Sequence, residues 1–182
     1  MPERILVDQD GVLADFENGF LNAWKQKFPE RPFVPIEERK TFSIRRDYPE
    51  EYSEDIYKIY TAKGFIENLP LIPGAIEAIR QMQKAGHFIK ICTSPLSRYD
   101  NCVTEKFAWV ERHFGIEWTK NIIIAKDKTQ IRGDFLIDDK PEITGDMNPI
   151  WEQIVFDQPY NKHITKKRRL ISWDNWQTVL NS

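Results

Sequence analysis

Two aspartates, Asp8 and Asp10, directly follow the first apolar run of the chain, Ile5-Leu6-Val7. The run is typical of a buried strand, and Gly11 then lets the backbone turn away sharply. Because ligands of open α/β sheets bind beyond the carboxyl ends of strands, both carboxylates stand where chemistry is expected. Their spacing places both acids on one face, where they repel each other unless a cation lies between them or one keeps its proton. Mg²⁺ fits best, since it binds one or two carboxylates together with phosphate oxygens, and solvated loop aspartates are the alternative.

Three later apolar runs also end in polar or charged residues. The groups at these ends are Thr93 and Ser94, Lys128, and Asp138 and Asp139. Because the carboxyl ends of parallel strands meet at one edge of a sheet, we expect these side chains to gather beside the two early aspartates. Transfer of a phosphoryl group needs a nucleophile, a proton donor and cations that offset the phosphate charge. The acids, hydroxyls and lysine at the four ends therefore predict phosphoryl-transfer chemistry.

The elements that must position these groups alternate between strands and helices. Helical spacing of apolar residues is found within 16–28, 76–86 and 105–114, and a last helix is expected after Ser172. Short apolar runs predict later strands at 87–92, 121–125 and 135–137, and a further one at 153–156. This alternation predicts an α/β fold with a Rossmann-like parallel sheet and helices on both faces.

Residues 16–71 differ from the rest of the chain. Three prolines (Pro29, Pro32 and Pro35) break the first helical pattern. The part that follows is rich in charged and aromatic side chains and has helical spacing near 53–63, without strand-like alternation. We therefore expect 16–71 to form a small helical cap inserted after the first strand. Residues 1–15 and 72–182 would then form one α/β core.

Length and composition describe a globular chain without a strong overall charge. The chain has 182 residues, of which 41% are hydrophobic and 13% aromatic, and its formal net charge is −2. These values predict a packed core and exclude an overall basic field that would recruit nucleic acid. The two cysteines and three histidines form no metal-binding or nucleophile pattern, and no apolar run is long enough to span a membrane. The expectation is a cytoplasmic protein that acts on a small molecule.

The residues at the strand ends resemble a known superfamily. Asp8-x-Asp10 followed by Gly-Val, the Thr93-Ser94 pair, Lys128 and the Asp138-Asp139 pair are similar to the four motifs of the haloacid-dehalogenase-like (HAD) phosphohydrolases. More narrowly, the stretches at 10–17, 91–95, 107–111, 127–129 and 136–139 resemble the 5′(3′)-deoxyribonucleotidase family. The likeness implies a HAD-like core and a phosphoric monoester hydrolase. The implied reaction is Mg²⁺-dependent hydrolysis of deoxyribonucleoside monophosphates through an aspartyl-phosphate intermediate.

The resemblance also implies a role for each acid. Asp8 would attack the phosphorus, while Asp10 would protonate the leaving oxygen and later accept a proton from the hydrolytic water. The Asp8 carboxylate, the Asp10 backbone carbonyl and Asp138 would hold Mg²⁺. Asp139 would support this set from a neighbouring position.

The same resemblance assigns the residues that bind the phosphate. Thr93 or Ser94 would donate hydrogen bonds to its oxygens, and Lys128 would supply a fixed positive charge. Lys106 would reach the phosphate from the following helix, and a solvated helix position is the alternative for this lysine.

Aromatic residues of the cap are expected to bind the nucleoside. Phe16, Phe42 and Phe65 stand where the family stacks aromatic rings on the base and sugar, and packing inside the cap is the alternative for each. Three positions of the expected pocket differ from side chains common in the family: Ser43, Ser97 and Lys140. These differences bear on base preference and on 5′ versus 3′ preference, which the motifs leave open.

Two other functions compete with this one. A HAD phosphatase that acts on another small phosphomonoester would share the motifs at the strand ends. A nucleotide-binding protein without turnover would be expected to lack one of Asp8, Asp10, Lys128 or Asp138, and all four are present. The family also implies a possible homodimer.

Overall fold

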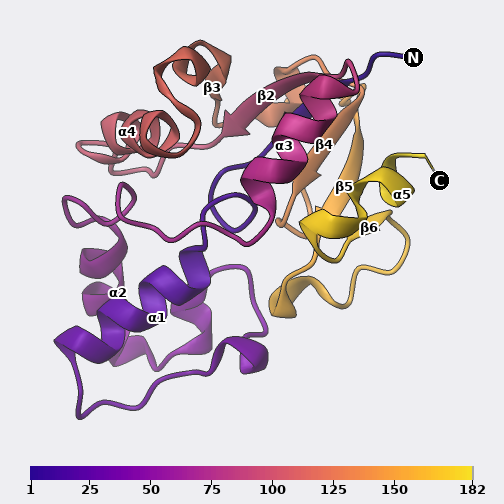
Figure 1. Cartoon of the computed structure of the whole chain (residues 1–182). Coiled ribbons are helices and arrows are strands. Elements are labelled where there is room, and N and C mark those ends of the chain that lie inside the picture. The colour runs from indigo at the N-terminus through magenta and orange to yellow at the C-terminus, as the bar shows by residue number, and fades with distance from the viewer. Residues whose placement is uncertain (182) are drawn as a thin grey trace.

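A six-stranded parallel sheet forms the centre of the computed structural model, which describes residues 1–181 (Figure 1). Its strands lie in the order β3-β2-β1-β4-β5-β6. They are β1 (Arg4–Val7), β2 (Phe88–Thr93), β3 (Ile122–Ile124), β4 (Phe135–Asp138), β5 (Glu152–Phe156) and β6 (Arg169–Leu170). The expected α/β fold with a parallel sheet is therefore confirmed, and the strand expected at 153–156 is present as β5.

Strand β1 is the place where the strand order reverses. It pairs in parallel with β2 on one side and with β4 on the other. The amide of Asp8 extends the second ladder by donating to the carbonyl of Ile137 at 2.9 Å. The carboxyl ends of β1, β2 and β4 therefore lie next to one another at a topological switch point, where α/β folds bind their ligands.

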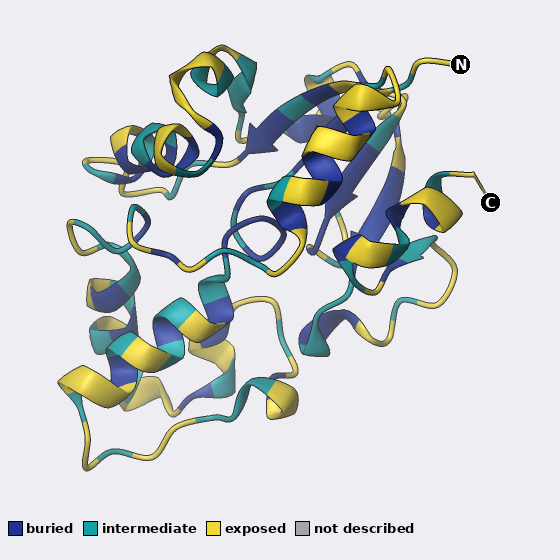
Figure 2. Ribbon diagram, viewed as in Figure 1, coloured by how far each residue is buried: buried dark blue, intermediate teal, exposed yellow. Residues whose placement is uncertain are grey.

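The two faces of the sheet are covered differently. Side chains of α3 (Ala75–Lys84), α4 (Cys102–Phe114) and α5 (Trp176–Leu180) join Ile5 and Val7 in one buried cluster. Figure 2 shows the resulting alternation of buried and exposed residues along α3. On the opposite face, Leu6 packs in a smaller cluster with Trp151 and with isoleucines of β3 and of the neighbouring loops. Shorter elements replace the helices expected on this face, because the connections 125–134 and 139–151 leave little room for a crossover helix.

Residues 16–71, the cap, contain a hydrophobic cluster of their own, whereas Ile66 and Leu69 at their end pack in the cluster of the sheet. They form α1 (Phe16–Lys27), α2 (Ser53–Tyr60) and the 3₁₀ turns η1 (Ile36–Glu38), η2 (Ile44–Asp47) and η3 (Glu50–Tyr52). Asp15 caps α1 by accepting from the amide of Asn18 at 3.0 Å, and the rings of Phe20, Trp24 and Tyr48 pack together in the centre. In Figure 1 these helices lie beyond the carboxyl ends of the strands. The division of the chain into two domains stays a prediction.

The C-terminal part contains a strand that sequence analysis missed. The basic run 166–169, which resembles a solvated loop, leads into β6, and Arg169 pairs with Asp157 at 2.7 Å. Arg168 pairs with Glu152 of β5 at 2.6 Å. A strand of two residues is too short for its periodicity to be recognised. The helix expected after Ser172 begins as the 3₁₀ turn η7 (Trp173–Asn175) and continues as α5.

Three further 3₁₀ turns connect the strands. They are η4 (Ile116–Asn121), η5 (Lys128–Gln130) and η6 (Pro159–Asn161). Within residues 1–181, no helix combines the length and the apolar character that crossing a membrane requires.

Candidate active site

The polar groups at the strand ends line one cavity of about 330 Å³. These groups form the floor of this cavity. The floor residues that the sequence predicted are Asp8, Asp10, Thr93, Ser94, Lys128, Asp138 and Asp139. The opposite wall comes from the cap and includes Phe16, Glu17, Phe42 and Tyr60. The structure therefore gathers four distant strand ends around a space that suits a small molecule.

Lys128 joins two of the acids at the bottom of the cavity. This lysine begins η5, its side chain is buried, and its Nζ lies 2.9 Å from Asp8 Oδ1 and 2.6 Å from Asp138 Oδ2. Burial alone lowers the pKa of Lys128, but the carboxylates of Asp138 and Asp8 raise that pKa above its ordinary value. Lys128 therefore keeps its positive charge and holds the ends of β1 and β4 together.

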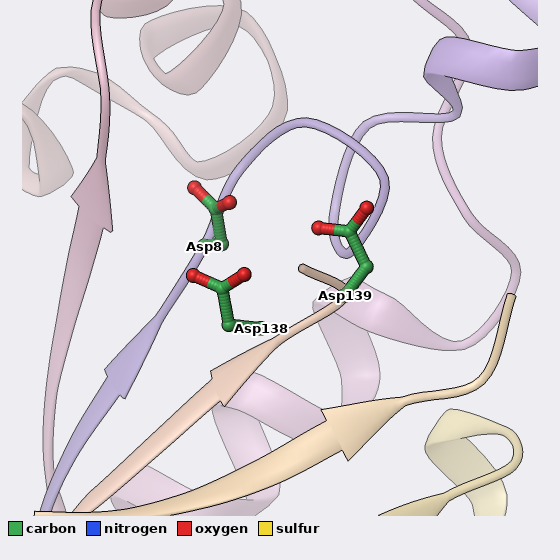
Figure 3. A group of neighbouring side chains, drawn as sticks. All are labelled: Asp8, Asp138 and Asp139. Carbon is green, nitrogen blue, oxygen red and sulfur yellow. The ribbon is translucent and has the colours of Figure 1, made fainter. Parts of the chain in front are cut away.

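Asp8, Asp138 and Asp139, once ionised, would carry more negative charge than the single ammonium of Lys128 neutralises. One carboxylate oxygen of each lies within 4.8 Å of the others, and Figure 3 shows the three side chains grouped at the ends of β1 and β4. Burial raises the pKa of Asp138 and, more strongly, that of Asp139, where the charges of Asp138 and Asp8 add to the effect. Within the described chain, Asp139 Oδ1 is buried without a hydrogen-bond partner. Oxygen donors, excess negative charge and an unpaired oxygen fit a divalent cation such as Mg²⁺.

The carboxylate of Asp10 lies outside this group and pairs with Lys106 of α4. Lys106 is completely buried, and its Nζ donates to Asp10 Oδ2 at 2.6 Å and to Thr93 Oγ1 at 2.9 Å. The solvated position considered for Lys106 is therefore wrong. Its ammonium contacts Asp10 and Thr93, and Lys106 is not among the described residues that line the cavity. Asp10 Oδ1 is buried and has no hydrogen-bond partner within residues 1–181.

The hydroxyl residues at the end of β2 take different positions. Thr93 is buried and receives the hydrogen bond from Lys106, whereas Ser94 donates to the carbonyl of Ala125 at 2.9 Å. Both line the cavity, as do Lys126 and Lys140 from neighbouring loops. The site therefore carries cations at its rim as well as at its floor.

Two of the three phenylalanines expected to bind the nucleoside face the cavity. Phe16 and Phe42 line it, and the side chain of Phe42 is exposed. The ring of Phe65 packs edge-on against Phe16, with 5.5 Å between the ring centroids. Phe65 is absent from the lining formed by the described residues, so it supports Phe16 from inside the cap.

Two buried residues with ionisable side chains line the cavity and were not selected from the sequence. Tyr160 of η6 donates its hydroxyl hydrogen to Asp139, and Glu17 of α1 pairs with the buried guanidinium of Arg39. Burial raises the pKa of Glu17, an effect that Arg39 opposes. Glu17 follows Phe16 within the motif at 10–17, whereas Tyr160 could be located only by knowing that β5 lies beside β4.

The loop that carries Lys128 is fastened by its neighbour Asp127. The Asp127 carboxylate accepts from the amide of Asp146 at 2.8 Å and from that of Thr129 at 2.9 Å. These bonds lower the pKa of Asp127 to about 2, the Asp146 amide having the largest effect. A Cβ atom on Gly145 would lie 1.9 Å from Asp127 Oδ1, so only glycine fits there. The contact explains why glycine stands at position 145.

Comparison with known proteins connects this arrangement to nucleotidases. The family described as 5′ nucleotidase, deoxy (pyrimidine), cytosolic type C protein matches residues 3–181. A Bordetella pertussis protein with the provisional name 5′(3′)-deoxyribonucleotidase is 51% identical over 176 residues, which cover 97% of this chain and 94% of that protein. The human 5′(3′)-deoxyribonucleotidase of cytosolic type is 44% identical, with 98% of this chain and 94% of that protein covered.

Solved structures of HAD hydrolases share the fold. A HAD family hydrolase from Deinococcus radiodurans, with bound phosphate and sodium, has a TM-score of 0.63 and is 16% identical, with 98% of this chain and 95% of that chain covered. A magnesium-bound HAD hydrolase from Bacillus subtilis has a TM-score of 0.61 and is 14% identical, with 100% and 99% covered. The whole chain therefore shares the fold of these hydrolases.

Proposed function

The chain belongs to the family of the 5′ nucleotidase, deoxy (pyrimidine), cytosolic type C proteins, and on this premise we propose that it hydrolyses deoxyribonucleoside monophosphates with the help of Mg²⁺. Membership makes it a phosphomonoester hydrolase of the nucleotidase type. One observation carries the finer proposal: Lys128 bridges Asp8 and Asp138 beneath a wall that contains Phe16 and Phe42. A fixed cation suits a phosphate, and aromatic faces suit a base or sugar.

In the first proposed step, Asp8 is the nucleophile. Its Oδ1 is already held by Lys128 and by the amide of Gln9 at 2.8 Å, which leaves the other oxygen for attack on phosphorus. The new phosphorus–oxygen bond forms on Asp8 while the bond to the nucleoside oxygen breaks. Asp10, held through Oδ2 by Lys106, gives that leaving oxygen a proton.

In the second step, water hydrolyses the aspartyl phosphate. Asp10 takes a proton from the water as the water oxygen bonds to phosphorus, and the bond between phosphorus and Asp8 breaks. Inorganic phosphate leaves, and both aspartates return to their starting states. Through both steps the ammonium of Lys128 and the hydroxyls of Thr93 and Ser94 offset the charge on the phosphate oxygens.

Mg²⁺ would be held by the Asp8 carboxylate, the Asp10 backbone carbonyl and Asp138, with Asp139 in support. When bound, it polarises the phosphate and neutralises part of its charge. The excess negative charge of the three grouped acids and the unpaired oxygen of Asp139 support this assignment. The magnesium in the Bacillus subtilis hydrolase of the same fold supports it further.

The cap would hold the nucleoside. Phe16 and Phe42 offer ring faces to the base and sugar, and Phe65 would act by keeping Phe16 in place. Lys106 would act on the phosphate through Asp10 and Thr93. A homodimer, implied by the family resemblance, and a cytoplasmic location, expected from the composition, are further predictions.

Phosphate release from dUMP and dTMP, and from UMP and ribothymidine monophosphate, tests the proposal. We expect Mg²⁺-dependent turnover of the deoxyribonucleotides, loss of turnover in EDTA and no turnover by Asp8→Asn. Turnover by Asp8→Asn equal to that of the unmodified enzyme would refute the assignment of Asp8 as the nucleophile. Turnover of unrelated small phosphomonoesters, with none of nucleotides, would establish instead a HAD phosphatase with another substrate.

A further inference from the structure

Tyr160 stands between the cap and the acidic floor of the cavity. It lies in η6, beyond the end of β5, and is 3% exposed although it lines the cavity. The neighbouring residues fix the turn: Gln158 donates to the carbonyl of Gly11 at 2.8 Å, and Asn161 donates to the carbonyl of Asp139 at 2.8 Å. The turn is thus tied to the loop after β1 and to the end of β4.

The hydroxyl of Tyr160 determines where the Asp139 carboxylate lies. It donates to Asp139 Oδ2, and Gly11 packs against the same oxygen so closely that a Cβ atom there would lie 2.7 Å from it. The other oxygen, Oδ1, is buried and unpaired within residues 1–181. Figure 3 shows Asp139 with one oxygen on the side of Asp8 and Asp138. A single hydrogen bond and one steric contact therefore hold this carboxylate in the acidic group.

The ring of Tyr160 contacts the cap. Its centroid lies 5.8 Å from that of Phe42 in an edge-on arrangement and 5.5 Å from the guanidinium carbon of Arg39. Arg39 is buried, donates to Asp47 at 2.7 Å and to the carbonyl of Thr41 at 2.9 Å, and so fixes the loop that presents Phe42. One side chain thus contacts the loop over the cavity and an acid of its floor.

We propose that Tyr160 is a positioning residue that couples the docking of the Phe42 loop to the orientation of the Asp139 carboxylate. This inference rests on the proposed function for its kinetic part. The two ends of the side chain do separate work: the hydroxyl orients the acid, and the ring supports the aromatic wall that holds the nucleoside. A residue that merely fills the core would affect stability alone.

Two variants separate these roles. Tyr160→Phe removes the hydroxyl and keeps the ring, so we expect kcat to fall about tenfold, as for loss of a hydrogen bond to a charged group, with KM for dUMP unchanged within about twofold. The Mg²⁺ concentration that half-maximally raises the melting temperature should rise in the same variant. Tyr160→Leu removes the ring as well, and KM should then rise severalfold.

Tyr48→Phe is the matched control. Tyr48 is a buried cap residue whose hydroxyl oxygen accepts from the amide of Val34 at 3.1 Å, outside the cavity lining of the described residues. Its loss should lower the melting temperature and leave kcat, KM and the Mg²⁺ midpoint unchanged. If Tyr160→Phe changed only the melting temperature, as expected for Tyr48→Phe, the proposal that the Tyr160 hydroxyl orients Asp139 would be overturned.

A double-mutant cycle tests the contact with the cap. Each single variant, Phe42→Leu and Tyr160→Leu, should raise KM. The product of the two fold-changes should exceed the fold-change of the double variant by about two- to tenfold, as expected for a coupled aromatic pair. Multiplicative effects would overturn the coupling. If Tyr160→Leu does not fold, the cycle uses Tyr160→Phe with Phe42→Leu. The coupling between these two substitutions is then measured in kcat and in the Mg²⁺ midpoint. An unmodified enzyme without phosphatase activity would refute the proposed function, and the Mg²⁺ midpoint of Tyr160→Phe would still test Asp139.

Discussion

Replacing Lys128 with methionine should expose how much negative charge the floor of the cavity holds. The ammonium is the cation that pairs with both Asp8 and Asp138, at 2.9 and 2.6 Å, and its side chain is 5% exposed. Lys128→Met would leave the half-buried Asp8 and the buried Asp138 and Asp139 close together without that cation. Removing one partner of a buried ion pair costs about 3–5 kcal/mol.

That loss is large for a domain of this size. Stabilities of about 5–15 kcal/mol are usual, and each kcal/mol shifts the melting temperature of such a domain by about 2–4 °C. We therefore expect Lys128→Met to melt about 6–20 °C lower in EDTA. Mg²⁺ should restore part of the difference, because a divalent cation would replace the missing charge, whereas phosphate release should stay abolished.

Urea and thermal unfolding with EDTA or Mg²⁺, together with phosphate release from dUMP, measure these effects. Lys126→Met is the control for stability, since it removes an exposed ammonium two residues away in the same loop. If Lys128→Met and Lys126→Met had the same melting temperature in EDTA, the floor would not depend on Lys128 for its charge balance. The grouped acids would then have no electrostatic need of a bound cation.

Three other perturbations have definite expected outcomes. Lys106→Met should lower kcat about ten- to hundredfold and change KM for dUMP by less than about threefold in steady-state kinetics. The reason is that Lys106 contacts Asp10 and is absent from the described cavity lining. A large rise in KM with kcat unchanged would show instead that Lys106 binds the phosphate directly. Gly145→Ala should lower the melting temperature and weaken the hydrogen bond from the Asp146 amide to Asp127, because the new Cβ atom would collide with the Asp127 carboxylate. Faster amide exchange at Asp146 would report the weakened bond, and an unchanged melting temperature would contradict the close contact. The pKa of Asp127 is about 2 in the folded chain, below its unfolded value, so its carboxylate stabilises the fold above about pH 4 and this stabilisation is lost as the pH falls towards 2. The difference in unfolding free energy between Asp127→Asn and the unmodified chain, measured by urea unfolding, should therefore shrink over this range. A difference independent of pH would refute the assignment.

Much of the fold could be predicted because it depends on local patterns. The apolar runs before Asp8 and Asp138 and the helical spacing within 16–28 are properties of neighbouring residues, and strands and helices impose their periods on them. Parallel strands bring their carboxyl ends to one edge, so the alternation of strands and helices sufficed to predict that these residues share that edge. The strand β6 was missed because two residues carry no recognisable period.

The sequence by itself determined which chemical groups stand at the strand ends and, through the resemblance, the family to which the chain belongs. Only the tertiary structure decided how these groups pair: Lys106 with Asp10, Tyr160 with Asp139, and Phe65 behind Phe16. The physical reason is that periodicity fixes the direction of a side chain relative to its own strand or helix. Which group it then meets depends on the distance and angle between elements, and these are set by the packing of the whole core.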